Sequence, residues 1–176
     1  MSFWVFGYGS LLWNPGFTPT QSVKARLHGY HRSFCMLSIH HRGTETDPGL
    51  VLALDAVPSG QCTGVALQVA ATEQDSVLTA LRERELISSA YIEQHVDLET
   101  DAGDVISALA YVIDPDHPQY CQFELERQAQ MIARAAGGRG PNTEYLYNTA
   151  AHLTQLGIKD SDMDWLVKRV RALTAT

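Results

Sequence analysis

The chain has 176 residues, of which 45% are hydrophobic and 19% are charged. This balance is typical of one folded globular domain and excludes a largely disordered chain. The formal net charge is −7, so no basic surplus is available to neutralise phosphates, and we expect no nucleic-acid partner.

No stretch approaches the roughly 20 apolar residues of a membrane span, and the N-terminal residues lack the pattern of a secretion signal, so no membrane partner is expected. The three cysteines, Cys35, Cys62 and Cys121, are widely spaced, as is typical of reduced thiols in the cytoplasm. We therefore expect a cytoplasmic protein with a single domain over residues 1–176. One core suffices for this length, which favours a monomer over a dimer.

The first two thirds of the chain have the pattern of β-structure. Short apolar or alternating runs predict strands at residues 4–6, 23–39, 50–54, 63–69, 91–98 and 105–113. The segment 57–60, Val-Pro-Ser-Gly, has the composition of a hairpin turn, so 50–54 and 63–69 are expected to pair. Between the fourth and fifth of these strands, Thr72 is a candidate N-cap for a helix whose apolar stripe is Val77, Leu78 and Leu81.

The last third has the pattern of helices. Helices are predicted over 123–136, from 142 or 143 to 156, and from a cap at Asp160 and Ser161 onward, and Gly137-Gly138 is interpreted as a helix end. In the last helix the apolar residues include Trp165, which is expected in the core. Strands first and helices last predict an α+β domain with a mostly antiparallel sheet or small β-barrel and flanking helices.

The first segment with functional potential is the loop after the first predicted strand, Gly7-Tyr8-Gly9-Ser10-Leu11. Glycine allows the backbone to approach a ligand closely, and successive N–H groups in such a turn can hold a carboxylate or an oxyanion. The spacing is not that of a phosphate-binding loop. On composition alone, a tight turn that serves packing remains the alternative.

The second such segment is the end of the predicted helix before residue 91. Glu85 follows Leu81 by four residues and Leu78 by seven, so it continues the apolar stripe, whereas Glu83 points toward solvent. Burial of a carboxyl raises its pKa toward neutrality, where it can both accept and donate a proton. A helix that ends before Glu85, or an arginine that neutralises it, remains the alternative.

Together these segments resemble the ChaC-like γ-glutamylcyclotransferases. Residues 4–17, Trp-Val-Phe-Gly-Tyr-Gly-Ser-Leu-Leu-Trp-Asn-Pro-Gly-Phe, are similar to the opening of that family. Arg84-Glu85 ahead of Tyr91 is similar to its Arg-Glu element. Its later landmarks are matched in order by His41-Arg42-Gly43, by residues 117–120 and by residues 138–146. The sequence departs from the family at Ser88-Ser89-Ala90, where glycines are usual, and at Pro141 between Gly140 and Asn142.

The resemblance implies cleavage of glutathione to 5-oxoproline and cysteinylglycine, in a mixed α+β fold around a small barrel and without metal or organic cofactor. It makes Glu85 the catalytic acid/base. Backbone N–H groups of Gly9, Ser10 and Leu11 would hold the substrate, with Tyr8 as one wall of the site. Arg42 would offer a cation to a glutathione carboxylate, and Tyr145 is a binding residue through the resemblance alone.

Other residues keep two interpretations. Tyr111 either lines the pocket or is a half-buried strand aromatic, and Arg82 and Arg84 have the pattern of solvated helix residues. The seven histidines show no HxxxH pair, so no metal site is expected. Two alternative functions share the proposed site: a cyclotransferase for other γ-glutamyl amines or amino acids, and a non-catalytic γ-glutamyl-binding domain.

Overall fold

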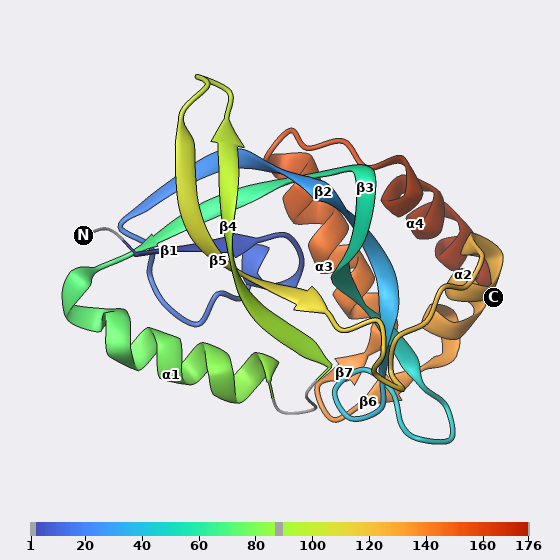
Figure 1. Cartoon of the computed structure of the whole chain (residues 1–176). Coiled ribbons are helices and arrows are strands. Elements are labelled where there is room, and N and C mark those ends of the chain that lie inside the picture. Colours follow the sequence, from blue (N-terminus) through green and yellow to red (C-terminus); the bar gives the residue numbers. More distant parts are fainter. Residues whose placement is uncertain (1–2, 87–89, 176) are drawn as a thin grey trace. The chain divides into compact units, whose positions relative to one another are not determined.

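The computed structural model describes residues 3–86 and 90–175. The strands and helices, in chain order, are β1 Phe3–Gly7, the 3₁₀ helix η1 Ser10–Leu12, β2 Gln21–Ser38, β3 Gly49–Val69, the 3₁₀ helix η2 Ala71–Glu73, α1 Gln74–Glu85, β4 Tyr91–Thr100, β5 Val105–Ile113, α2 Leu125–Arg134, β6 Ala136–Gly137, β7 Gly140–Pro141, α3 Asn142–Gln155 and α4 Ser161–Thr174 (Figure 1). The chain forms two compact units. The barrel unit comprises Ala53–His117 and the residues up to Ser33, and the helical unit comprises Phe34–Leu52 and the residues from Pro118 onward.

Five strands form a closed barrel in the order β1-β3-β2-β4-β5. Most ladders are antiparallel: β4 pairs with β5 from Tyr91 opposite Ile113 onward, and β1 pairs with β3. Parallel bridges join Val5 of β1 to Leu109 of β5, and β3 to β5, which makes the barrel mixed. The predicted α+β class, with a mostly antiparallel sheet or small barrel and helices, is confirmed.

The predicted hairpin at residues 57–60 is wrong, because β3 is one strand of 21 residues that continues without interruption through this segment. Gly60 lies so close to β2 that a Cβ on it would be 3.0 Å from the carbonyl oxygen of Tyr30. Gly60 therefore marks a close approach to a neighbouring strand rather than a turn.

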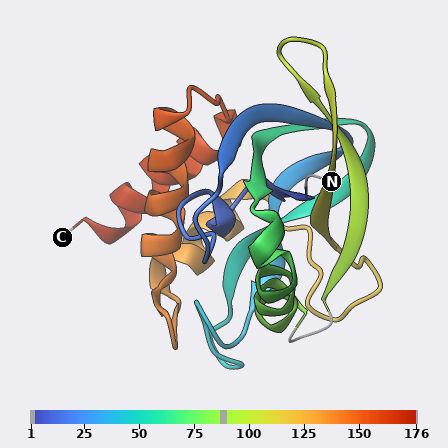
Figure 2. The same cartoon turned by 90° about the vertical axis from the view of Figure 1, so that its left-hand side faces the viewer.

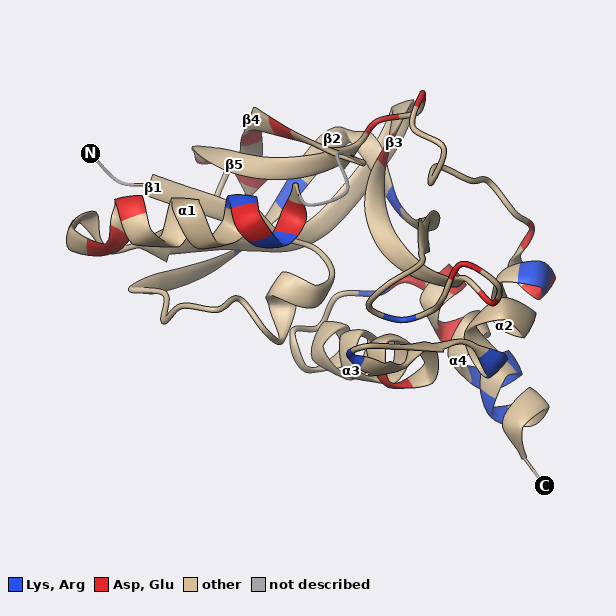
Figure 3. Cartoon of the chain, turned by 90° about the horizontal axis from the view of Figure 1, so that it is seen from below, with Lys and Arg blue, Asp and Glu red and all other residues tan. Residues whose placement is uncertain are grey.

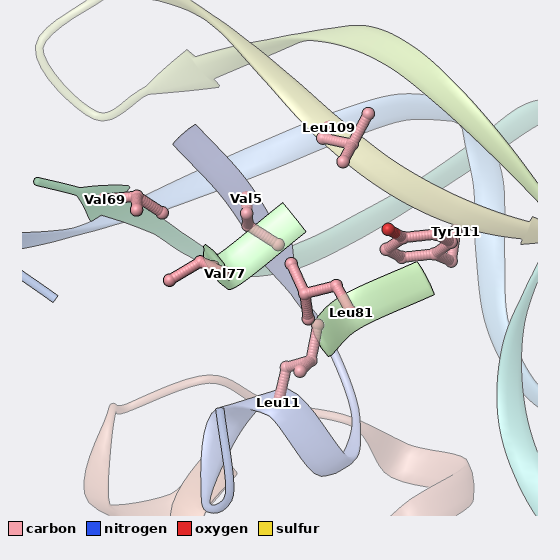
Figure 4. Packing of buried hydrophobic residues seen from close by; sticks show 7 residues of the cluster. All are labelled: Val5, Leu11, Val69, Val77, Leu81, Leu109 and Tyr111. Carbon is pink, nitrogen blue, oxygen red and sulfur yellow. The ribbon is translucent and has the colours of Figure 1, made fainter. Parts of the chain in front are cut away.

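Helix α1 packs its apolar face on the barrel. Val77 and Leu81 are buried, and they form one cluster with Val5, Leu11, Val69, Leu109 and Tyr111 (Figure 4). Burial of one such aliphatic side chain contributes about 1.5–3 kcal/mol. Figure 4 shows Leu11 facing Leu81, so the loop after β1 and the helix α1 share this cluster. The helix begins at Gln74, after the turn η2, and Thr72 does not cap it.

In the helical unit, α2, α3 and α4 pack against one another (Figure 2). Asp160 caps α4 as predicted, because its Oδ1 accepts a hydrogen bond of 3.1 Å from the Met163 N–H. The prediction for Trp165 is wrong: its exposed fraction is 40%, since the buried face of α4 consists of Met163, Leu166 and Val170. Gly137 does not end α2; it lies in the two-residue strand β6, which pairs with β7.

Within the part of the chain that the structure describes, no helix has both the length and the apolar composition needed to cross a membrane.

Candidate active site

The loop after β1 is a single 3₁₀ turn held by its own backbone. The N–H of Leu12 donates to the Gly9 carbonyl over 2.9 Å, and the N–H of Asn14 donates to the Ser10 carbonyl over 2.8 Å. The first N–H groups of such a turn have no partner within the turn. The N–H groups of Ser10 and Leu11 therefore have no acceptor within the turn, and their role in binding a carboxylate or an oxyanion stays a prediction.

Tyr8 ties this loop to β5. Its side chain is buried, and its hydroxyl donates a hydrogen bond of 2.8 Å to the backbone carbonyl of Tyr111. Two of the residues that the sequence singled out, 103 positions apart in the chain, are thereby in direct contact.

Arg32 of β2 is hydrogen-bonded to the same loop. It was not among the residues predicted from the sequence. Its buried guanidinium donates to the carbonyl of Tyr8 over 3.1 Å and to the carbonyl of Thr63 over 2.9 Å. A buried cation is costly unless it is hydrogen-bonded, so these bonds make its position tolerable. The sequence carried a signal for the burial of Arg32, because this residue alternates with Phe34 and Met36 on the buried face of a strand.

Glu85 is the last residue of α1, and only 13% of its side chain is exposed. The helical spacing predicted this position correctly, and Glu83 is exposed, also as predicted. Figure 3 shows the charged residues that end α1 as alternating basic and acidic bands. The carboxylate has a cation beside it, because Nε of Arg84 lies 3.4 Å from Oε1 of Glu85.

The Tyr111 hydroxyl is bound by Glu93, and Glu93 is in turn paired with Arg82. This hydroxyl donates to Oε1 of Glu93 over 3.0 Å, and Arg82 donates to both oxygens of the same carboxylate over 3.0 and 2.9 Å. Burial raises the pKa of Tyr111 far above its usual value, with further contributions from the hydrogen bond to Glu93 and from the charges of Glu93 and Glu85. The Arg82 hydrogen bond lowers the pKa of Glu93.

Tyr111 is therefore a neutral phenol that donates a hydrogen bond to the ionised carboxylate of Glu93. Tyr111 was a candidate from its sequence position, whereas Glu93 and its pairing with Arg82 had no such signal. The helix end and β4 bring Arg82 and Glu93 together, and local sequence patterns carry no signal for that contact.

Arg42 and Tyr145 belong to the helical unit, where they lie next to each other. Nη1 of Arg42 donates to the Pro141 carbonyl over 3.0 Å and to Oε1 of Glu144 over 3.2 Å, and its guanidinium carbon is 5.9 Å from the centre of the Tyr145 ring. The Tyr145 hydroxyl accepts a hydrogen bond from the Leu52 N–H over 3.0 Å. The structure thus brings Arg42 and Tyr145 together within their own unit.

The departure from the family pattern at Ser88 and Ser89 lies outside the described residues. Within 3–86 and 90–175, no group of three or more His, Cys, Asp or Glu side chains is arranged to hold a metal ion.

Comparison with known proteins agrees with this fold. A family model described as "ChaC-like protein" matches residues 3–173. A glutathione-specific gamma-glutamylcyclotransferase of Escherichia coli (strain K12) is 38% identical over 176 residues, which cover 98% of this chain and 74% of that protein. Glutathione-specific gamma-glutamylcyclotransferase 1 of Homo sapiens is 35% identical over 162 residues, covering 90% of this chain and 73% of that protein.

A crystal structure of a yeast gamma-glutamyl cyclotransferase specific to glutathione has the same fold, with a TM-score of 0.90 at 23% identity over 99% of this chain and 97% of that one. The fold is thus that of the γ-glutamylcyclotransferase-like proteins, a five-stranded mixed β-barrel with α-helices. Because the family model spans nearly the whole chain and these relatives exceed 30% identity, the chain belongs to the ChaC-like family.

Proposed function

We propose that this protein is a glutathione-specific γ-glutamylcyclotransferase that converts glutathione to 5-oxoproline and cysteinylglycine. One observation carries the site assignment: a largely buried carboxylate, Glu85, lies at the end of a helix that packs against the Tyr8–Leu11 loop. Family membership over residues 3–173 supports the reaction.

The reaction is intramolecular. The α-amine of the γ-glutamyl group attacks its own γ-carbonyl carbon, a five-membered ring closes, and the amide bond to the cysteine nitrogen breaks. The enzyme must fold the substrate, remove a proton from the attacking nitrogen and return one to the leaving nitrogen. Both reacting groups belong to one molecule, so positioning and proton transfer are the main tasks of the protein.

Glu85 performs both proton transfers in this proposal. It accepts the proton of the attacking nitrogen and then donates it to the departing cysteine nitrogen, so that protons balance over one turnover. A carboxyl group with little solvent around it is suited to this exchange. The N–H groups of Gly9, Ser10 and Leu11 hold the substrate carboxylate or the oxyanion that forms on the γ-carbonyl.

Tyr8 and Tyr111, both in the barrel unit, form walls of the proposed site. Tyr8 is fixed by its hydrogen bond to Tyr111, and Tyr111 is fixed by Glu93, so neither ring needs to be ordered by the substrate. Arg42 and Tyr145 enter the proposal through the family resemblance. Their contacts with Glu144 and Leu52 also give them a structural role within the helical unit.

We also propose that glutathione is the physiological substrate, that the protein is cytoplasmic and that it acts as a monomer formed by a single domain. The small number and wide spacing of the three cysteines support a reducing compartment, in which glutathione itself is abundant in its thiol form.

The test is incubation of the purified protein with glutathione, with 5-oxoproline and cysteinylglycine followed by mass spectrometry. Glu85→Gln is expected to lower kcat by more than ~10³-fold, because a general acid/base contributes ~10²–10⁴-fold and this one acts twice. Glu83→Gln is the matched control, since Glu83 is on the same helix turn and exposed, and it should keep full activity.

A panel of γ-glutamyl dipeptides runs in parallel. Release of 5-oxoproline only from the dipeptides would replace glutathione by other γ-glutamyl amines or amino acids as the substrates of the same site. Absence of release from every substrate would refute the enzyme and leave a γ-glutamyl-binding domain.

A further inference from the structure

One side chain that is not among the proposed site residues contacts both the loop after β1 and Glu85. Arg84 has its Nη2 2.9 Å from Oγ of Ser10, its Nη1 donates to the backbone carbonyl of Asn14, and its Nε lies 3.4 Å from Oε1 of Glu85. Gly16 is also close, because a Cβ on it would lie 4.0 Å from Nη1 of Arg84. The guanidinium therefore joins the loop after β1 to the carboxylate at the end of α1.

The burial of Arg84 separates it from an ordinary helix arginine. Only 17% of its side chain is exposed, whereas Arg82, two residues earlier, is 52% exposed and pairs with Glu93. Side chains two positions apart point to different sides of a helix, so the two arginines serve different partners. The expectation of a solvated Arg84 is wrong because the Ser10–Asn14 turn lies over it.

The planar guanidinium suits this position. Its N–H groups form a fixed fork, so one group can donate in several directions at set angles, which a lysine ammonium on a flexible stem does not reproduce. Here its N–H groups donate to the Ser10 hydroxyl and the Asn14 carbonyl, and its Nε forms an ion pair with the Glu85 carboxylate over 3.4 Å.

The contact also decides what the Ser10 hydroxyl can do. Arginine has donors only, so Oγ of Ser10 is the acceptor in this bond. Its own hydrogen is then available for a bond to another acceptor. A hydroxyl oriented in this way can bind an acceptor oxygen of a substrate, such as a carboxylate or a carbonyl.

We infer that Arg84 is a positioning residue that fixes the Ser10 hydroxyl as a hydrogen-bond donor to the γ-glutamyl substrate and holds the Ser10–Asn14 turn against Glu85. The inference rests on the proposed function for the substrate, but the tie between turn and helix is a property of the protein alone. If Arg84 only stabilised the fold, the contribution of the Ser10 hydroxyl to kcat/KM would be the same with and without Arg84.

A double-mutant cycle separates these two roles. The variants are Ser10→Ala, Arg84→Met and the pair together, with kcat and KM for glutathione as readouts. Arg84→Met is expected to lower kcat/KM at least ~10-fold. The fold-loss of kcat/KM caused by Ser10→Ala should be at least ~3-fold smaller in the Arg84→Met background than in the wild type. Strictly additive effects in the cycle would overturn the inference.

Two further variants complete the design. Arg84→Lys keeps the charge without the fork and should recover less than half of the lost kcat/KM. Arg26→Met is the matched control, because Arg26 also bridges two groups, Glu99 and Asp101, but on the β4–β5 hairpin. It should leave kcat/KM unchanged, and a loss equal to that of Arg84→Met would contradict a specific role for Arg84.

Hydrogen exchange gives a readout that needs no turnover. The backbone amides of residues 10–14 should exchange faster in Arg84→Met than in the wild type, and at the wild-type rate in Arg26→Met. Wild-type exchange in Arg84→Met would overturn the inference. A wild-type protein that releases no 5-oxoproline would refute the proposed function, whereas faster exchange in Arg84→Met would still support the tie between the turn and the helix.

Discussion

The hydroxyl of Tyr111 donates its hydrogen bond to Glu93 and not to a group in the loop after β1. A phenol has one proton, and that proton is committed to a carboxylate that Arg82 keeps ionised. The raised pKa of Tyr111 keeps the phenol neutral at every physiological pH. We therefore expect Tyr111 to offer its ring, and no proton, to the proposed site.

This relationship predicts a small loss of stability for one substitution of Tyr111 and a large loss for another. Tyr111→Phe keeps the ring and should retain kcat/KM within ~3-fold, while the free energy of unfolding falls by about 0.5–1.5 kcal/mol for the lost hydrogen bond. Tyr111→Ala removes a fully buried ring from the cluster with Leu81 and should destabilise the protein by about 3–5 kcal/mol. Steady-state kinetics and urea unfolding measure both. A loss of 10²-fold or more in Tyr111→Phe would show that the hydroxyl takes part in the reaction.

The Arg82–Glu93 pair predicts a pH dependence of stability. The pKa of Glu93 is lowered from 4.5, chiefly by the hydrogen bonds from Arg82. Above pH 4.5 the carboxylate is ionised in the folded and unfolded chains, and the pair contributes fully. As the pH falls through the lowered pKa, Glu93 becomes protonated in the folded chain and the contribution is lost.

Glu93→Gln should therefore reduce the free energy of unfolding by about 1 kcal/mol at pH 7, and the difference from the wild type should shrink toward pH 3. Urea unfolding at several pH values measures it. Glu83→Gln, an exposed neighbour on α1, is the control and should show little difference at any pH. A constant difference between wild type and Glu93→Gln from pH 7 to pH 3 would contradict the assignment.

The helical period gave the position of Glu85, because spacing from Leu78 and Leu81 is a local property of the chain. The same period placed Trp165 wrongly. The buried residues of α4 are Met163, Leu166 and Val170, so Trp165 lies one position, about 100° of helix rotation, away from that stripe. Apolar character alone did not decide which side of α4 is covered.

Contacts between distant segments could not be predicted. Arg84 meets Ser10 across 74 positions and Arg32 meets Tyr8 across 24, and no short-range pattern encodes either bond. The continuation of β3 through residues 57–60 also depends on contacts between distant segments, since pairing with neighbouring strands outweighs the local turn preference of proline and glycine. Sequence thus provided candidate residues in the loop and at the helix end, and the tertiary structure adds the groups that contact them.

Asn142 in the helical unit predicts a large effect on stability. Its side chain is fully buried and forms two hydrogen bonds with one residue of β3: Oδ1 accepts from the Leu50 N–H over 2.8 Å, and Nδ2 donates to the Leu50 carbonyl over 2.9 Å. It therefore takes the place of a neighbouring strand. Asn142→Ala leaves a buried N–H and a buried carbonyl without these partners, and each such group costs about 1–3 kcal/mol.

We therefore expect Asn142→Ala to lower the free energy of unfolding by about 2–5 kcal/mol, measured by urea unfolding. Asn148→Ala on the same helix is the matched control, because it removes an amide of equal size from a half-buried position and should cost less than about 1 kcal/mol. Asn142→Asp keeps the acceptor for the Leu50 N–H but places an oxygen against the Leu50 carbonyl, so it should also destabilise the protein. Equal stability of the Asn142→Ala and Asn148→Ala variants would show that the hydrogen bonds to Leu50 contribute nothing to the fold.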